Sequence, residues 1–499
     1  MSVSRLGLAA VVFAAVSVLF AGCTTTVDPP ESSKSLTIGV TLEPPTLDLT
    51  TSDAASIPQV LLYNVYETLL KIDSDGQIRP LLASAYQVSE DGLVYTFELD
   101  PAALFASGTP VDGDAVAASI NQMREAPSQT WRSQMAVIAD VVVVDAQTVQ
   151  VILSQPSNFW LYSMTSTPGI IFDPALTDLA TKPAGSGPYK LKDWVKGDQI
   201  ILEKNPNYWA TPGQFETVTF RYIPDPNAMV AAMLSGDLDI VGELTSPDSL
   251  PQFNDTAKYT VLRGTTNGEV VLGFNHNRPA LQDLLVRQAI CHAIDRQGLV
   301  DNVWGGQGEL IGSMVVPTDA YYEDLSMRYP YDPDKARELL AQAGVTNLKL
   351  ALRVPADAPY APPAATYIAS QLAEVGITAT VEELDFGSRW LPEVFIDGDY
   401  DMTIVAHVEP RDIVNFANPN YYWHYDNPAF QSLIQQADAG PADQFVPTMI
   451  QAAALLADDA AADWLFVFPN LIVARAGLSG IGQNATTLSF DVTTISAKG

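Results

Sequence analysis

Apolar residues recur at helical spacing in the second half of the chain. Between residues 285 and 294 they fall at positions i, i+1, i+4, i+5, i+8 and i+9, which form one face of a helix. A second helix is expected from Pro333 to Ala343. Asp332 suits its N-cap, proline suits the first helical position, and Gly344 suits the residue after the last turn.

The region that follows predicts a strand, a helix and a second strand. Apolar residues alternate over 348–354, and a helix is expected over 365–375, where Gly376 ends it. A strand is expected over 378–384. Because only short loops join these elements, we expect a βαβ unit with parallel strands, which places the chain in the α/β class.

The first half of the chain predicts mainly strands. A buried strand over 36–40 ends at the proline-rich loop 44–48, and helical spacing over 60–70 predicts a helix before a turn at 73–76. We expect 36–40 and 404–405 to lie in other sheets than the βαβ unit. Further strands are expected at 95–99, 141–144 and 149–153.

Composition and charge narrow the class of protein. The 499 residues predict about three domains, and 47% apolar with 17% charged residues indicate a globular chain. The formal net charge of −32 disfavours nucleic acid as a partner, because such a surface repels phosphate. It weakly favours cationic or zwitterionic ligands, although an acidic surface also serves solubility alone.

The first residues have the pattern of an export signal. Arg5 precedes an apolar run that ends in small residues, so we expect residues 1–22 to be a signal peptide, with an uncleaved anchor as the alternative. The residues before Cys23 resemble a lipobox, in which that thiol is lipidated, and 23–35 would be a lipidated cysteine and flexible tether. Cys291 would then be the remaining free thiol.

Motifs for other chemistry are missing. No HExxH motif, paired CxxC or GxSxG motif is present, so no metal ligand set, cofactor or nucleophile is predicted. The segment 185–188 lacks the Lys-Ser/Thr of a phosphate loop and is expected to form a turn. An exported hydrolase is kept as a remote alternative, and the protein is not expected to be an enzyme.

Short motifs along nearly the whole chain, in order, resemble solute-binding family 5, the substrate-binding proteins of peptide/nickel ABC importers. Each motif is weakly specific, but together they are strongly so. They are Leu47-Asp48, Val65–Leu69, Pro80–Ala83, Ser89–Gly92, Tyr95–Phe97, Gly185–Tyr189, Lys204–Trp209, Ser235–Asp239, Phe274-Asn275, Val286–Ile290, Ala293–Arg296, Tyr331–Gly344 and Tyr400–Met402.

This resemblance implies a two-lobe periplasmic-binding-protein-like fold of type II, cluster C, with an extra inserted domain. The first lobe would comprise 36–75, 185–268 and 470–499, with the inserted domain at 76–184. The second lobe would be 269–469. Lobes of this kind close about a hinge and bury a small ligand between them.

The resemblance also implies the function and partners. The protein would be a monomeric bacterial lipoprotein on the outer face of the cytoplasmic membrane. It would capture oligo- or dipeptides and deliver them to an ABC permease and ATPase complex. A nickel or other metal chelate, or another polar small molecule, is the alternative ligand.

Candidate ligand-binding residues follow the family pattern. In peptide binders of this family an acidic residue after a second-lobe strand meets the ligand amine, and Glu409 is the best match, with Asp412 as the alternative. This sequence has Ala406 and Glu409 where the family usually has Trp and Asp. The loop 52–56, with Asp53 and Ala55, would supply backbone contacts to an extended peptide.

Three arginines are candidates for a ligand carboxylate, and the sequence does not rank them: Arg411, Arg389 and Arg353. For each, a surface ion pair is the competing interpretation. Trp423 or Tyr422 is expected to line the pocket, with core packing as the alternative. His407 beside Glu409 would bind a metal chelate if that were the ligand, and otherwise would be a hydrogen-bonded histidine at a strand end.

Overall fold

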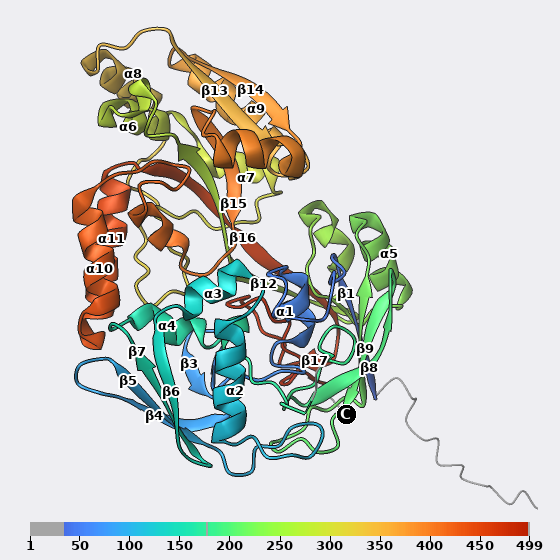
Figure 1. The fold of residues 1–499 in the computed structure, drawn as a ribbon. Coiled ribbons are helices and arrows are strands. Elements are labelled where there is room, and N and C mark those ends of the chain that lie inside the picture. The colour runs from blue at the N-terminus through green and yellow to red at the C-terminus, as the bar shows by residue number, and fades with distance from the viewer. Residues whose placement is uncertain (1–33, 176–177, 498–499) are drawn as a thin grey trace, which may run out of the picture.

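A sheet of ten strands forms the frame of the molecule. The computed structural model describes residues 34–175 and 178–497 (Figure 1). The strands lie in the order β14 (Ile377–Leu384), β13 (Leu348–Pro355), β15 (Met402–His407), β12 (Tyr259–Phe274), β16 (Ala462–Arg475), β11 (Ile240–Val241), β1 (Ser35–Val40), β10 (Thr217–Tyr222), β9 (Gln199–Lys204) and β8 (Tyr189–Val195).

Strands β12 and β16 run between the two halves of this sheet. They pair antiparallel from Tyr259 opposite Arg475 to Gly273 opposite Ala462. At one end β16 pairs with β11, and at the other β12 pairs with β15. The ladder is irregular between Thr265 and Glu269. Two groups of elements therefore share one continuous pair of strands (Figure 1).

This topology corrects one expectation from the sequence. The segments 36–40 and 404–405 were expected to lie in sheets separate from the βαβ unit, and this is wrong. Both belong to the same ten-stranded sheet as β13 and β14. The physical reason is the length of β12 and β16, whose backbone hydrogen bonds extend the sheet across both halves.

The predicted βαβ unit is confirmed. Strands β13 and β14 pair in parallel from Leu348–Ile377 to Pro355–Leu384, with α9 (Ala361–Glu374) between them. The helix begins earlier than expected because two prolines fit its first turn. Other helices of this half are α6 (Leu284–Ala293), α7 (Arg296–Val303), α8 (Pro333–Gln342), α10 (Pro428–Ala439) and α11 (Phe445–Asp458).

Local capping rules hold at helix α8. The side chain of Asp332 accepts a hydrogen bond from the backbone N–H of Lys335 at 2.9 Å, and Pro333 is in the first turn. Gly344, just past the end, has φ +67°, a conformation that glycine adopts without strain. The sequence therefore predicts both ends of this helix.

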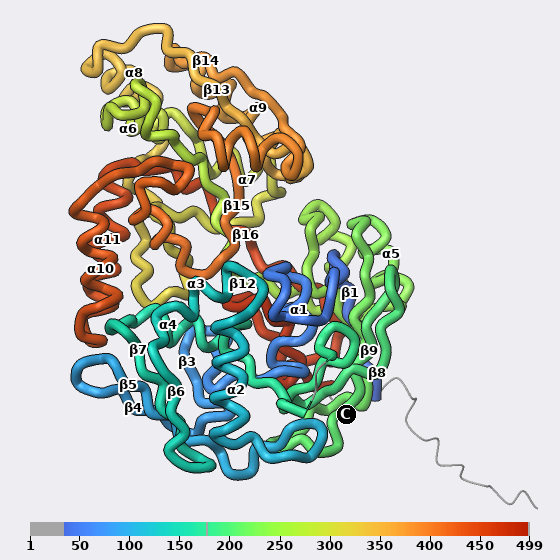
Figure 2. Tube along the Cα trace, viewed as in Figure 1, coloured from blue at the N-terminus to red at the C-terminus, as the bar shows by residue number. Residues whose placement is uncertain are grey.

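A second sheet of four strands lies apart from the frame, in the lower part of the fold traced in Figure 2. Its order is β4 (Ala83–Val88), β5 (Val94–Leu99), β7 (Thr148–Leu153) and β6 (Ile138–Asp145), with α2 (Gly113–Arg124), α3 (Gln129–Met135) and α4 (Asn158–Ser163) beside it. Remaining elements include α1 (Ser56–Leu61), α5 (Pro226–Ser235) and two antiparallel pairs, β2 (Leu70–Ile72) with β3 (Ile78–Pro80) and β17 (Leu478–Ser479) with β18 (Ser496–Ala497).

The helix expected over 60–70 is a second correction. Helix α1 ends at Leu61, and residue Tyr63 has φ +64°, which a regular helix does not allow. The carbonyls of Asn64 and Val65 instead accept hydrogen bonds from the N–H groups of Tyr189 and Gly187. Residues 62–70 are buried on all sides, so their apolar spacing reports burial rather than one helix face.

The glycine-rich turn at 185–188 explains those contacts. Gly185 and Gly187 lie so close to the backbone of residues 64–66 that a Cβ atom at either position would come within 2.6 Å of a backbone oxygen. The segment is buried and precedes strand β8 rather than a helix, as the sequence predicts.

Within residues 34–175 and 178–497, no helix combines the length and apolar character needed to cross a bilayer.

Candidate ligand-binding site

A cavity of about 790 Å³ lies where the carboxyl end of β15 meets α4 and α10. Its walls include the segment 405–412, the short π-helix η5 (Phe386–Ile396), and side chains from α4 and α10. Aromatic residues dominate several of these walls: Phe159, Tyr162, Phe386, Trp390, Phe395, Tyr421 and Tyr422. Elements far apart in the sequence thus enclose one concave, partly apolar space of the size that small ligands need.

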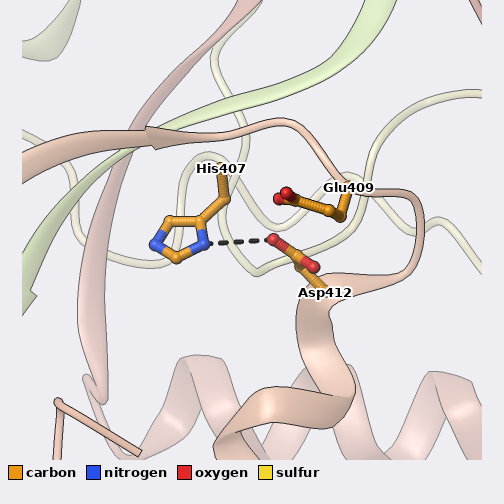
Figure 3. Close-up of side chains that lie close together, drawn as sticks. All are labelled: His407, Glu409 and Asp412. Carbon is orange, nitrogen blue, oxygen red and sulfur yellow. Dashed lines mark hydrogen bonds and ion pairs between the residues drawn. The ribbon is translucent and has the colours of Figure 1, made fainter. Parts of the chain in front are cut away.

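A polar group of side chains stands at the end of β15 (Figure 3). The Nδ1 atom of His407 lies 3.0 Å from a carboxylate oxygen of Asp412, and its Nε2 atom lies 2.9 Å from the hydroxyl of Tyr422. His407 and Asp412 are buried, whereas Glu409 is exposed. One ligand atom from each of His407, Glu409 and Asp412 lies within 4.8 Å of the others.

Glu269 on β12 adds a carboxyl group beside this cluster. It pairs directly opposite His407 across the two strands, so both side chains stand on the same face of the sheet. Its side chain is 3% exposed, and within the described residues its Oε2 atom has no hydrogen-bond partner. Burial first, and then the nearby carboxylate of Asp412, raise the pKa of Glu269 well above its ordinary value.

Arg411 brings a positive charge to the same cavity. Its guanidinium carbon lies 3.6 Å from the ring centre of Tyr162 on α4, a cation–π contact between distant parts of the chain. Arg411 has φ +64° and makes no ion pair within 4 Å among the described residues. Its buried Nε atom has no hydrogen-bond partner there either. The guanidinium therefore keeps hydrogen-bonding capacity for another group.

Five of the predicted site residues line the same cavity: Ala406, His407, Glu409, Arg411 and Asp412. Asp53 and Ala55 are not among its lining residues. The carboxylate of Asp53 instead accepts a hydrogen bond from the hydroxyl of Thr130 at 2.8 Å, and Ala55 is exposed just before α1.

Trp423 and Tyr422 differ in their positions. Trp423 is fully buried and stacks on Phe416 with ring centres 3.9 Å apart, whereas the side chain of Tyr422 reaches the cavity and His407.

Two of the candidate arginines, Arg353 and Arg389, do not line the cavity. They form an ion-pair network with Glu382, Glu393 and Asp399.

Sequence reasoning missed Glu269 and Tyr162. An acidic residue directly before the apolar run 270–272 is a signal that could have drawn attention to Glu269, because a charge in a buried strand is costly. For Tyr162 the sequence holds no such signal, since it reaches the cavity only through the packing of α4.

The cavity as a whole suits a small ligand that carries both charges. Carboxylates of Glu409 and Asp412 can accept hydrogen bonds from an ammonium group, and Arg411 can bind a carboxylate. The aromatic walls can contact an apolar part of the ligand.

The fold defines the class of protein. A mixed α/β sheet that continues through two long shared strands, with a cavity between packed elements, is the architecture of the type II periplasmic binding proteins. The expected fold class is confirmed. The structure is similar to NikA from Brucella suis in complex with Fe(III)-EDTA, with a TM-score of 0.81 and 22% identity, covering 94% of this chain and 100% of that one.

A second solved structure gives the same fold. It is the ABC transporter-associated periplasmic binding protein DppA from Helicobacter pylori in complex with the peptide STSA. The TM-score is 0.76 and the identity 21%, covering 94% of this chain and 99% of that one.

Residues 77–430 match the model of the bacterial extracellular solute-binding proteins, family 5 Middle, and the chain belongs to this family. The predicted resemblance is confirmed. Among curated proteins the chain is 28% identical over 474 residues to the probable D,D-dipeptide-binding periplasmic protein DdpA of Escherichia coli strain K12. That match covers 86% of this chain and 88% of the relative.

Proposed function

We propose that the protein captures short peptides outside the cytoplasm and delivers them to an ABC permease and ATPase complex, without catalysing a reaction. The observation that carries this proposal is the meeting of Glu409, Asp412 and Arg411 in one aromatic-walled cavity. A peptide presents an ammonium and a carboxylate, and each needs a charged partner when it leaves water. The Escherichia coli relative is a probable D,D-dipeptide-binding protein, which supports the same ligand class.

We propose further that the molecule works as two lobes, 36–75 with 185–268 and 470–499, and 269–469, with an inserted domain at 76–184. The irregular ladder between Thr265 and Glu269, opposite Pro469 and Val467, supports a hinge at this place, since missing ladder bonds make strands easier to bend. Closure about it would bury the ligand against α4 and the segment 405–412.

The amine partner is tested by Glu409→Gln. We expect binding of a dipeptide panel, measured by isothermal titration calorimetry, to weaken by about 2 kcal/mol or more, or roughly 30-fold in Kd. Glu98→Gln is a matched control, because Glu98 is exposed on β5 and is not among the cavity residues. Unchanged binding by Glu409→Gln would place the amine elsewhere. No binding of any peptide by the wild-type protein would reject the peptide class.

A metal chelate is the second candidate ligand, favoured by His407 at the cavity wall. The Brucella suis structure holds such a chelate, Fe(III)-EDTA. Native mass spectrometry of protein purified without denaturation separates the candidates. Released masses that fragment as short peptides support the first, and one non-peptide mass with a metal isotope pattern supports the second.

We propose that Cys23, which lies outside the described residues, is lipidated and holds the protein at the outer face of the cytoplasmic membrane. The lipobox-like residues before it support this. The wild-type protein should incorporate labelled fatty acid and Cys23→Ser should not, and a wild-type protein without label would contradict the lipid anchor.

A further inference from the structure

Three side chains at the end of β15 have the composition of a transition-metal site. His407, Glu409 and Asp412 offer one nitrogen and two oxygen ligands, all within 4.8 Å of one another (Figure 3). Two ligands on one ion at about 2.0–2.2 Å are separated by about 3–3.5 Å. The Nδ1 atom of His407 and the carboxylate oxygen of Asp412 are already 3.0 Å apart.

The surroundings of His407 also suit a metal ligand. A ligating histidine normally has its second ring nitrogen held by a hydrogen bond, which fixes the tautomer and the ring orientation. Here Nε2 lies 2.9 Å from the hydroxyl of Tyr422, and the two rings are stacked at an interplanar angle of 7°. If Nε2–H donates to that hydroxyl, the lone pair of Nδ1 points toward Asp412, where the ion would lie.

Glu269 is a second, independent observation. It is 3% exposed, stands on the same face of the sheet as His407, and its Oε2 atom has no partner among the described residues. A buried carboxyl oxygen without a partner is costly unless something binds it. A cation held by its neighbours would supply a favourable charge close to it.

We propose that His407, Glu409 and Asp412 bind one divalent first-row transition-metal ion directly, with Tyr422 holding His407 in place. One imidazole and two carboxylates suit ions such as Zn²⁺, Ni²⁺ or Co²⁺, whereas Ca²⁺ and Mg²⁺ prefer oxygen ligands alone. Three protein ligands leave coordination positions open, and exposed Glu409 gives the ion a way in.

This inference rests on the proposed ligand cavity but differs from the chelate alternative. In the chelate alternative the ion is bound within a small molecule. In the site proposed here the protein itself supplies three ligands to the ion. The ion and a peptide amine would share Glu409 and Asp412. Each is therefore expected to weaken binding of the other.

The test is titration of the untagged protein with CoCl₂, followed by visible absorption and calorimetry. We expect one Co²⁺ per chain, with d–d bands that report nitrogen and oxygen ligands. His407→Gln and Asp412→Asn should each weaken Co²⁺ binding by at least about tenfold, and Tyr422→Phe by about 10- to 100-fold. Tyr421→Phe is the matched control, because Tyr421 lines the cavity but makes no hydrogen bond to His407.

Folding of each variant is checked by thermal melting. If a variant at a buried residue does not fold, Co²⁺ binding by Glu409→Gln tests the metal site instead, because Glu409 is exposed and its replacement does not disturb the core. No Co²⁺ binding by the wild-type protein, or unchanged affinity in folded His407→Gln or Glu409→Gln, overturns the metal site. Peptide binding measured in parallel separates the two proposals. Peptide binding without Co²⁺ binding rejects the metal site alone, and Co²⁺ binding without peptide binding rejects the peptide class alone.

Discussion

Glu67 shows how burial controls a single ionisable residue. It is 1% exposed, and its carboxyl oxygens accept hydrogen bonds from the hydroxyl of Tyr208 at 3.1 Å and the indole N–H of Trp209 at 3.0 Å. Desolvation outweighs these bonds and raises the pKa of Glu67 to about 7. The folded protein therefore holds a proton there that the unfolded chain releases at lower pH.

The first prediction concerns the pH dependence of stability. Because the folded pKa is the higher one, the native state binds more protons between the ordinary value of 4.5 and about 7, so stability falls as pH rises through this window. The contribution of Glu67 is about 3 kcal/mol, from roughly 1.4 kcal/mol per pKa unit. Glu67→Gln removes the titration. Its amide oxygen can still accept from Trp209, and its NH2 group can donate to the hydroxyl of Tyr208, which reverses the direction of that bond.

Urea denaturation at pH 4.5, 6 and 8 measures this effect. The stability difference between the wild type and Glu67→Gln should change in favour of the variant as pH rises. Glu98→Gln, at an exposed position of β5, serves as the control for a Glu-to-Gln change away from this site. A wild-type profile parallel to that of Glu67→Gln would contradict the raised pKa.

The element that links the halves is the strand pair β12 and β16, and a segment near the C-terminus is fastened to it. The side chain of Asn484 accepts a hydrogen bond from Thr265 N–H at 3.0 Å, and Gln483 donates to the carbonyl of Arg263 at 2.7 Å. A Cβ atom on Gly264 would lie 1.8 Å from the carbonyl oxygen of Gln483. This close approach requires glycine at position 264.

We therefore predict that Gly264→Ala destabilises the protein by about 1–3 kcal/mol, because the segment at 483 must shift away from β12. Urea denaturation measures the loss. Gly387→Ala is the matched control, since a Cβ atom there meets no atom within 4 Å. Equal stability of the two variants would show that the approach of Gln483 to β12 is not tight.

At the scale of the whole molecule, the cavity is built from elements that lie far apart in the sequence. Helix α4 lies beside the four-stranded sheet, whereas the segment 405–412 comprises the end of β15 in the large sheet and the residues after it. The contact of Arg411 with Tyr162 joins these two walls. Ligand binding between these walls should therefore couple to the lobe closure proposed above.

We expect a bound dipeptide to stabilise and compact the molecule. At 100 times its Kd, the peptide should add about 2.7 kcal/mol to the free energy of unfolding. Small-angle X-ray scattering should show a smaller radius of gyration under the same conditions. Glu409→Gln at the same peptide concentration is the control. Stabilisation without compaction would contradict closure while leaving peptide binding intact.

The sequence determined the features that depend on neighbouring residues. The ends of α8 follow from Asp332, Pro333 and Gly344, and the parallel pairing of β13 and β14 follows from strand, helix and strand at short spacing. Motifs along the chain indicated the family, and the residues of the segment 405–412 indicated one wall of the cavity. Capping, periodicity and motifs are local, so a single sequence carries them.

Only the tertiary structure decided what depends on distant contacts. Residues 62–70 are not helical because their backbone bonds to the segment 187–189, and 36–40 shares a sheet with 404–405 because β12 and β16 connect them. The meeting of Glu269 with His407, and of Tyr162 with Arg411, likewise depends on strand register and helix packing. Such contacts join residues more than 100 positions apart, and their energies are set by the assembled fold rather than by local pattern.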